Sequence, residues 1–237
     1  MFNFIEGEVL LINKPTGWTS FDVVNKIRGA IRNYLREHSE ESKAKAGKIK
    51  VGHAGTLDPL ATGLLIICTG KFTKRIDEFM AQEKEYTGTI TFGASTASYD
   101  SETPPEQTFE TSHLTKENII KASENFIGDI QQIPPMYSAI KMDGKKLYEL
   151  ARKGETVEVK PRAVHIKEFE LSNFDLPTIS FRIVCSKGTY IRSIAHDLGK
   201  ALNNGAYLSS LRRTRIGEYR IEDAMEVGEF VGVVTSR

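Results

Sequence analysis

The sequence predicts an α+β protein. Stretches with the apolar spacing of helices and stretches with the period-two alternation of strands follow one another without regular strand-helix alternation, which favours α+β over a doubly wound parallel sheet. The 237 residues, 40% of them hydrophobic, suffice for one core, or for one core with a small appendage. The chain contains no internal repeat, glycine-rich dinucleotide fingerprint or phosphate-binding loop, so no cofactor is implied.

The N-terminal part of the chain predicts one strand and one amphipathic helix. Residues 8–13 contain an apolar run that is short enough for a strand buried on both faces. Thr19 or Ser20 can cap a helix in which apolar residues follow helical spacing as far as Tyr34. Residues 37–50 are polar, contain four lysines and predict a mobile loop. Such runs are more often solvated surface, but the position of this one, just before residues 52–63, leaves phosphate contact open.

The remaining elements follow from the same periodicities and from turn residues. Strands are predicted at residues 64–69, 84–93, 133–142, 156–159, 164–171, 179–186 and 207–216. Helices are predicted at residues 71–80, 115–127, 145–153 and 193–202 and within 221–237. Residues 94–112 are rich in Ser, Thr, Pro and acidic side chains and predict a surface excursion.

Charge and cysteine usage bound the possible classes of protein. A formal net charge of +1 gives no global nucleic-acid signal, so any such contact must come from local patches. The strongest patch is residues 187–220, which contain seven Lys or Arg and three Tyr but only one Asp and one Glu. Such a segment is suited to binding looped RNA, but it can equally be a strand edge with solvated cations. Cys68 and Cys185 lie in apolar runs, which indicates buried thiols in a reducing compartment and no metal site. Without a membrane span or signal-peptide pattern, the chain is expected to be cytoplasmic.

Residues 52–63, GHAGTLDPLATG, form the most informative stretch. Its three glycines allow a close approach to a ligand or positive φ angles. Pro59 moves the preceding Asp58 away from helical geometry, so the carboxylate should project from a restrained backbone, as a nucleophile or acid requires. An Asp-Pro pair near glycines also marks ordinary turns, and the dipeptide alone leaves both interpretations open.

This stretch closely resembles the signature of the tRNA pseudouridine synthase B (TruB) family, G-H-x-G-x-L-D-P-x-A-x-G. Further segments resemble family blocks in the same order, namely residues 11–20, 84–86, 135–141 and 185–192. The resemblance implies the pseudouridine synthase fold, a mixed, largely antiparallel sheet flanked by helices with the active-site cleft across it. It implies a catalytic domain at residues 1–217. Residues 218–237 are expected to form a short helix and tail, too few for the complete RNA-binding PUA domain of many relatives.

The resemblance also implies a function. The expected reaction is isomerisation of the T-loop uridine of tRNA, position 55, to pseudouridine after the base is flipped into the active site. Neither a cofactor nor a metal is expected. The expected partner is the T-arm of tRNA. No membrane contact and no obligate protein partner are expected, so the protein should be a monomer. A non-catalytic RNA-binding or RNA-folding module, or the same chemistry on another RNA, remain as alternatives.

Three catalytic residues follow from the resemblance. Asp58 matches the catalytic carboxylate, and Arg192 matches the arginine that pairs with it, holds it ionised and orients it. Tyr86 matches the tyrosine that stacks on the target base and whose hydroxyl could serve a late proton transfer. Taken alone, Arg192 would be a surface cation and Tyr86 a core aromatic.

Three further residues match family positions at the substrate. His53 matches a histidine at the flipped base, and Tyr190 and Leu211 match positions that contact the uridine. Taken alone, His53 would be a structural histidine and Leu211 a core residue. Lys14 and Pro15 are expected to brace the catalytic loop and not to touch the substrate.

Overall fold

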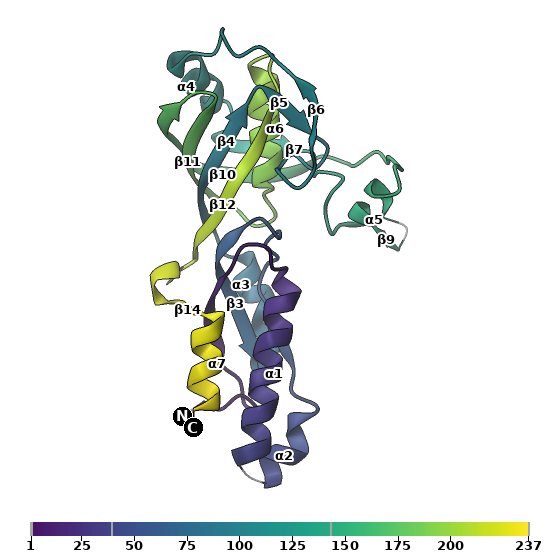
Figure 1. Ribbon diagram of the computed structural model, residues 1–237, viewed down its shortest axis with the longest axis vertical. Helices are drawn as coiled ribbons and strands as arrows, with labels where there is room; N and C mark the ends of the chain where they lie inside the picture. Colours follow the sequence, from purple (N-terminus) through teal and green to yellow (C-terminus); the bar gives the residue numbers. More distant parts are fainter. Residues whose placement is uncertain (1, 39, 143, 237) are drawn as a thin grey trace. The chain divides into compact units, whose positions relative to one another are not determined.

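The chain forms two compact units. The computed structural model describes residues 2–38, 40–142 and 144–236. One unit consists of Met1–Lys84 with Arg212–Arg237, and the other of Glu85–Leu211 (Figure 1). Strand β12 (Ala206–Ile216) crosses this boundary and contributes residues to both.

The first unit combines the two ends of the chain. Its elements are β1 (Val9–Lys14), α1 (Ser20–His38), α2 (Glu40–Ala46), β2 (Val51–His53), β3 (Thr62–Thr69), the 3-10 helix η1 (Gly70–Arg75), α3 (Ile76–Ala81), β13 (Tyr219–Arg220), the 3-10 helix η2 (Ile221–Asp223), β14 (Met225–Glu226) and α7 (Val227–Thr235). The strand order is β14-β1-β3-β12, with β2 paired to β3 and β13 to β12. Strand β1 is antiparallel to β3 and parallel to β14.

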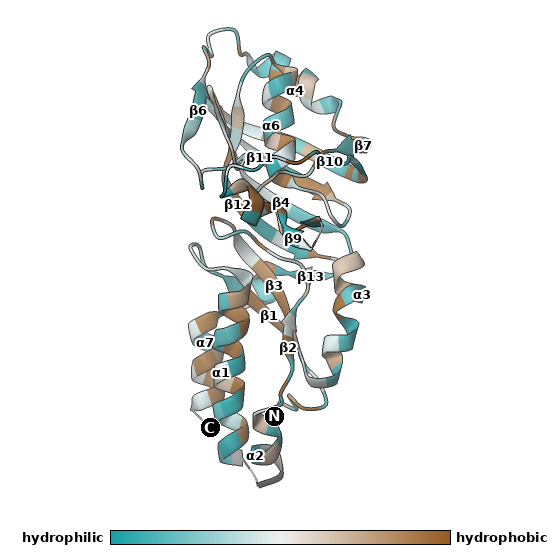
Figure 2. Cartoon of the chain, turned by 90° about the vertical axis from the view of Figure 1, so that its right-hand side faces the viewer, coloured by the Kyte–Doolittle hydropathy of each residue, from teal (hydrophilic) through white to brown (hydrophobic). Residues whose placement is uncertain are grey.

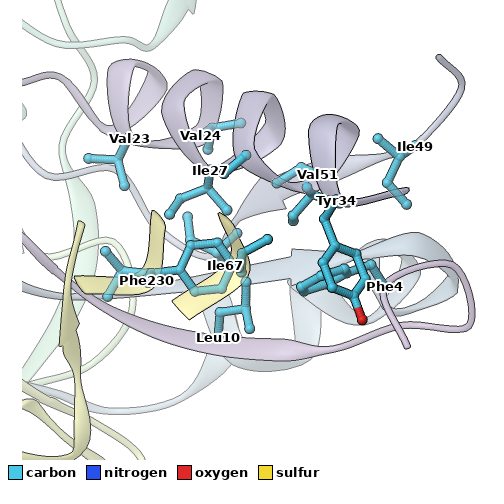
Figure 3. Close-up of a cluster of buried hydrophobic side chains, with 14 of the residues drawn as sticks. Phe4, Leu10, Val23, Val24, Ile27, Tyr34, Ile49, Val51, Ile67 and Phe230 are labelled. Atoms are coloured by element: carbon cyan, nitrogen blue, oxygen red, sulfur yellow. The ribbon is translucent and has the colours of Figure 1, made fainter. Parts of the chain in front are cut away.

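The core of this unit lies between its sheet and two helices. Helices α1 and α7 run side by side (Figures 1 and 2), and the apolar side of α1 packs with Phe230 of α7 and Phe4 over the sheet (Figure 3). Strand β3 is almost wholly buried and appears brown in Figure 2 because it is apolar along most of its length. Strand β1 alternates buried with half-buried residues, so only one of its faces is fully buried.

The second unit is built on five strands that continue the same sheet. Its elements, besides the first half of β12, are β4 (Lys84–Phe92), β5 (Ala94–Thr96), β6 (Pro105–Thr108), α4 (Lys116–Glu124), β7 (Gly128–Gln132), β8 (Lys141–Met142), β9 (Lys145–Lys146), α5 (Leu147–Ala151), β10 (Arg162–Asp175), β11 (Thr178–Cys185) and α6 (Ile191–Ala201). The strand order is β12-β4-β11-β10-β7, and β10 is antiparallel to both β11 and β7. Helix α4 packs on α6 and on β10.

The predicted fold class is confirmed, since the strands form a mixed, largely antiparallel sheet with helices around it. Four local predictions are wrong or incomplete. Residues 37–50 contain helix α2, and residues 94–112 contain the hairpin β5-β6. Of the strand predicted at 133–142 only β8 forms, and residues 133–140 form none, because Pro134 and Pro135 offer no N–H to a ladder; the longer strand β7 lies just before them. Residues 156–159 form no strand.

None of the helices in the described ranges is both long and apolar enough to cross a bilayer.

Candidate active site

The loop that carries Asp58 is held between two paired strands. Strands β2 and β3 are antiparallel, with His53 opposite Ile67, so residues 54–61 must turn the chain between them. Gly63, at the end of this turn, has φ +103°, and a Cβ there would lie 2.3 Å from the Arg213 backbone oxygen. Only glycine fits this position, which explains one of the three motif glycines.

Asp58 is half-buried on this loop. Its backbone oxygen accepts a hydrogen bond from the Ala61 N–H at 3.1 Å, which closes a tight turn around Pro59. The preceding residue is fixed as well, because the Leu57 N–H donates to the Ser20 hydroxyl at 2.8 Å and that hydroxyl donates back to the Leu57 oxygen at 3.2 Å. The carboxylate is therefore mounted on backbone that is restrained on both sides.

Lys14 braces the other side of the loop, as the sequence predicted. Its ammonium group is fully buried and donates to the backbone oxygens of Pro15 at 2.9 Å, Trp18 at 2.6 Å and Pro59 at 3.4 Å. Burial lowers the pKa of Lys14 to about 8, and the negative charge of Asp58 partly opposes this shift. Lys14 therefore supplies a positive charge near Asp58 at neutral pH as well as a mechanical link.

Arg213 and His53 complete the surroundings of the loop. The Arg213 side chain is buried and donates from Nε to the Leu64 oxygen at 2.8 Å and from Nη2 to the Gly55 oxygen at 3.1 Å. Burial, and then the Arg213 charge, lower the pKa of His53, while the backbone of Gly55 partly opposes this. The lowered pKa favours the neutral form of His53.

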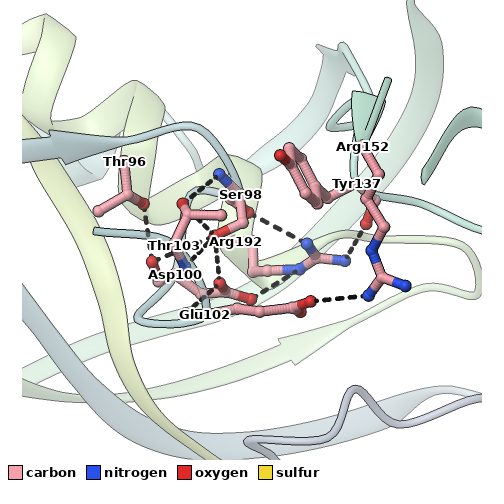
Figure 4. Close-up of polar contacts among 8 residues, drawn as sticks. All are labelled: Thr96, Ser98, Asp100, Glu102, Thr103, Tyr137, Arg152 and Arg192. Atoms are coloured by element: carbon pink, nitrogen blue, oxygen red, sulfur yellow. Dashed lines mark hydrogen bonds and ion pairs between the residues drawn. The ribbon is translucent and has the colours of Figure 1, made fainter. Parts of the chain in front are cut away.

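In the second unit, Arg192 lies at the start of α6 and is almost fully buried (Figure 4). Its Nη1 donates to the Ser98 oxygen at 3.1 Å and its Nη2 to the Tyr137 oxygen at 2.9 Å. Its Nε lies 3.6 Å from Oδ2 of Asp100, whose side chain has no exposed surface. The guanidinium is therefore held on several sides in one orientation.

Asp100 is fixed by its own loop. Its Oδ1 accepts hydrogen bonds from the Ser98 hydroxyl at 2.5 Å and from the Glu102 N–H at 2.9 Å (Figure 4). Tyr99, between them, has φ +62°, and its ring stacks on His196 of α6 with centroids 3.7 Å apart. Burial, followed by the charge of Lys200, lowers the pKa of His196 to about 4, so a neutral ring meets Tyr99. This stack packs the loop that contains Asp100 against α6, the helix that carries Arg192.

Tyr190 immediately precedes α6 and is held at its backbone and its ring. Its N–H donates to the Gln132 side chain at 2.8 Å, and the Gln132 amide donates to the Tyr190 oxygen at 3.0 Å. The Arg162 guanidinium lies 4.4 Å from the Tyr190 ring centre and also donates to the Gly188 oxygen. Arg162 thereby links both ends of the 188–190 segment.

The last two predicted residues lie on strands of the second unit. Tyr86 is in β4 and is 9% exposed, and Leu211 is near the middle of β12 and is 8% exposed. Their low exposure matches core residues as well as residues that line a deep site.

The structure places His53 and Asp58 in the first unit and Tyr86, Tyr190, Arg192 and Leu211 in the second. The pairing of Arg192 with Asp58 therefore stays a prediction. Sequence reasoning missed Asp100, which it placed within a surface excursion; a buried aspartate between Ser98 and Glu102 carries no pattern that separates it from exposed acidic neighbours. In the described part of the chain, no group of three or more His, Cys, Asp or Glu side chains is arranged to hold a metal ion.

Comparison with known proteins assigns the chain to a family. Residues 43–191 match the model of the TruB family pseudouridylate synthase N-terminal domain, and residues 192–235 match that of the tRNA pseudouridylate synthase B C-terminal domain. A Flavobacterium johnsoniae protein named tRNA pseudouridine synthase B is 53% identical over 227 residues, covering 96% of each chain. The Phocaeicola vulgatus protein of the same name is 55% identical over 228 residues, covering 96% of this chain and 93% of the relative.

Solved structures agree with these matches. One chain of a Cbf5-Nop10-Gar1 complex aligns with a TM-score of 0.68 and 27% identity, covering 96% of this chain. The alignment spans 54% of that longer chain.

The fold and the sequence blocks around Asp58 and Arg192 define the class of protein, a pseudouridine synthase and hence an isomerase. Both family models match, and the relatives are more than 50% identical over almost their whole length. These matches narrow the assignment from the class of enzyme to one family. This chain belongs to the TruB family of pseudouridylate synthases.

Proposed function

We propose that this chain isomerises a uridine of tRNA to pseudouridine and that the uridine is the T-loop residue at position 55. The relatives from Flavobacterium johnsoniae and Phocaeicola vulgatus carry the name tRNA pseudouridine synthase B, which supports tRNA as the substrate. The observation that carries the proposal is Asp58, a carboxylate on the family's signature loop that Lys14 and Ser20 restrain from two sides. Such restraint is what a catalytic group needs in order to meet a substrate atom without reorganisation.

The reaction needs few components. The bond between C1′ of the ribose and N1 of the uracil breaks, the base rotates, and a bond forms between C1′ and C5; the C5 proton leaves and N1 ends with a proton. Atoms and electrons balance without an oxidant, reductant or second substrate. Asp58 is proposed as the group that acts at the ribose or at C6, because an ionised carboxylate can form a covalent bond or stabilise positive charge there. A glycoside hydrolase would require two flanking carboxylates and an attacking water.

The second unit is proposed to supply the remaining catalytic groups. Arg192 would pair with Asp58 and keep it ionised, and its fixed guanidinium is suited to hold a carboxylate in one orientation. Tyr86 would stack on the uracil and assist removal of the C5 proton.

The target base must leave its stack to reach these groups. His53, Tyr190 and Leu211 are proposed to contact the RNA around the extruded base. The neutral state of His53 and the fixed Tyr190 ring support such contacts. We further propose that the enzyme acts as a monomer on the T-arm, in the cytoplasm.

The deciding experiment is tritium release from an unmodified tRNA transcript labelled at C5 of uridine, with purified protein, no added metal and Asp58→Asn as the control. The amide keeps the shape of the side chain and removes its charge, so the variant should bind tRNA normally and release no tritium. A matched transcript in which the uridine at position 55 is replaced by cytidine should give no release with either protein.

Release by the wild type alone supports the proposal. Tight tRNA binding without any release would favour a non-catalytic RNA-binding module. Release from the transcript lacking uridine 55 would move the target to another position or another RNA. Residual activity of Asp58→Asn combined with lost binding would contradict the role of Asp58.

A further inference from the structure

An open groove of about 260 Å³ lies on the first unit beside the strand that leads to the catalytic loop. It is lined by Arg28 and Arg32 of α1, by residues 49–52 and by Thr73 of η1. Arg28 and Arg32 are four residues apart on a helix and so project from the same face. No proposed catalytic residue lines this groove.

The groove is lined by cations and by no acidic residue. Arg28, Arg32 and Lys50 contribute three positive charges. Arg28 donates to the Val51 oxygen at 3.5 Å and Arg32 to the Gly47 oxygen at 3.4 Å, both long hydrogen bonds. Among the described side chains, those of residues 2–37, 42–142 and 144–236, Nε of Arg32 is buried without a hydrogen-bond partner, and none of the three cations forms an ion pair.

Three cations of the same unit that lie outside the groove form ion pairs. Lys71 pairs with Glu6 at 2.6 Å, Arg75 with Glu78 at 2.9 Å and Arg215 with Glu83 at 2.8 Å. The groove, by contrast, brings together three cations and no acidic residue on a chain whose formal net charge is only +1. A local field of this kind attracts anions although the whole protein does not.

The position of the groove favours one anion. Gly52 belongs both to the groove and to the signature stretch, and β2 continues from Val51 to His53 and then into the Asp58 loop. A strand advances about 3.3 Å per residue, so His53 lies within one strand length of the groove. A nucleic acid with one nucleotide at Asp58 carries further phosphates along its chain, and the groove lies on the strand that leads to the Asp58 loop.

We propose that the groove formed by Arg28, Arg32 and Lys50 binds the phosphodiester backbone of the RNA whose uridine reaches Asp58. This inference rests on the proposed function. Guanidinium groups recognise phosphate through paired N–H donors, and Arg28 and Arg32 each use one donor in a long hydrogen bond to the backbone, which leaves further N–H groups for phosphate oxygens. An open groove accommodates a continuous chain, whereas an enclosed pocket would suit a free anion.

The test compares tRNA binding by the Arg28→Gln/Arg32→Gln protein with binding by the wild type over a series of salt concentrations. Removal of phosphate-contacting cations weakens binding and lowers the slope of log K against log salt by about 1 per cation. We expect roughly tenfold weaker binding in the double variant and a slope lower by about 2. Arg28→Lys/Arg32→Lys, which keeps the charges but loses the planar forks, should keep the wild-type salt slope and show an affinity between those of the wild type and the glutamine variant.

Lys26→Gln is the matched control, because Lys26 is an exposed cation of the same helix outside the groove. Its affinity and salt slope should equal those of the wild type. Thermal unfolding of each variant establishes that it is folded, and Arg28→Gln alone replaces the double variant should that one unfold.

The tritium assay on the wild type runs beside these measurements. If the wild type turns over and the glutamine variant binds tRNA with unchanged affinity and salt slope, the proposed role of the groove in RNA binding is wrong and the proposed function is unaffected. Equal losses in Lys26→Gln would also overturn it, because the effect would then be general charge. A wild type that neither binds nor modifies tRNA would overturn both proposals.

Discussion

Lys14 is a fully buried lysine whose pKa of about 8 lies well below its ordinary value of 10.5. The unfolded chain therefore binds more protons than the folded chain between pH 8 and 10.5, and in this window the Lys14 contribution to the free energy of unfolding rises with pH. The rise is at most about 3 kcal/mol, at about 1.4 kcal/mol per pH unit.

Urea unfolding of the wild type and of Lys14→Met at pH 7.5, 9 and 10.5 measures this contribution. The difference in stability, wild type minus variant, should grow with pH. A difference that is constant or shrinks over these three pH values would show that burial does not lower the pKa of Lys14. Lys50→Met, at an exposed lysine of the same unit, serves as the control.

Asp100 is the buried counter-charge of Arg192, and we expect Asp100→Asn to impair both stability and turnover. Loss of one partner of a buried ion pair leaves the other charge uncompensated, which costs about 3 kcal/mol or more. The single-turnover rate should fall at saturating tRNA, since Arg192 loses one of the groups that orient it.

Glu102→Gln is the matched control for Asp100, because the Glu102 side chain is more accessible and pairs with an exposed Arg152 at 3.2 Å. It should change stability by less than about 1 kcal/mol. Arg192→Lys, which cannot reproduce the planar fork, should lower the single-turnover rate as Asp100→Asn does. A normal rate in both variants would mean that the orientation of Arg192 does not matter for turnover.

The resemblance of residues 52–63 to the family signature indicates Asp58 as the catalytic carboxylate, and glycine and proline predict the restrained backbone around it, because local backbone is encoded by neighbours in the chain. The sequence also indicates that Lys14 braces the loop. The sequence does not indicate Asp100 or the three acceptors of Lys14, since those contacts join residues whose separation no periodicity encodes. Whether Tyr86, Tyr190, Leu211 and His53 act on the substrate remains a prediction of the family resemblance.

At the scale of elements, Gly63 shows how one strand depends on its neighbour. Strand β3 runs parallel to β12 at Gly63, where Arg213 is the register partner. We expect Gly63→Ala to destabilise the protein by more than about 1 kcal/mol, because the new Cβ meets a positive φ and the Arg213 backbone together.

Gly17→Ala separates these two causes. Gly17 also has a positive φ, +79°, but nothing lies within 4 Å of a Cβ there. Chemical denaturation should show a larger loss of stability for Gly63→Ala than for Gly17→Ala. Equal losses would mean that the backbone angle alone, and not the contact with Arg213, requires glycine.

Long periodic elements were predictable, and short or interrupted ones were not. The predicted strands at 64–69, 84–93 and 179–186 fall close to β3, β4 and β11, because burial imposes a regular pattern over many residues. Helix α2 has seven residues with no apolar stripe, and Ala46 alone of its described side chains is deeply buried. Its helical form therefore leaves almost no hydrophobic signal in the sequence.

At the scale of the whole molecule, the first unit depends on residues from both ends of the chain. Helix α7 places Val227, Phe230 and Val234 in the same apolar cluster as α1 and β3. Phe230 has no exposed surface, so Phe230→Ala should lower the free energy of unfolding by about 3–5 kcal/mol. Val231→Ala, on a half-buried neighbour, should cost clearly less, and equal costs in urea unfolding would contradict the packing of α7.

The discontinuous first unit also sets an order of events during protein synthesis. Residues 85–211 form one uninterrupted segment, so the strand pairings within them do not require residues 212–236. The first 84 residues emerge earlier but must wait for residues 212–236, since β12 and α7 complete their sheet and core. Nascent chains stalled before β12 should therefore carry the Asp58 loop in a segment that is still protease-sensitive.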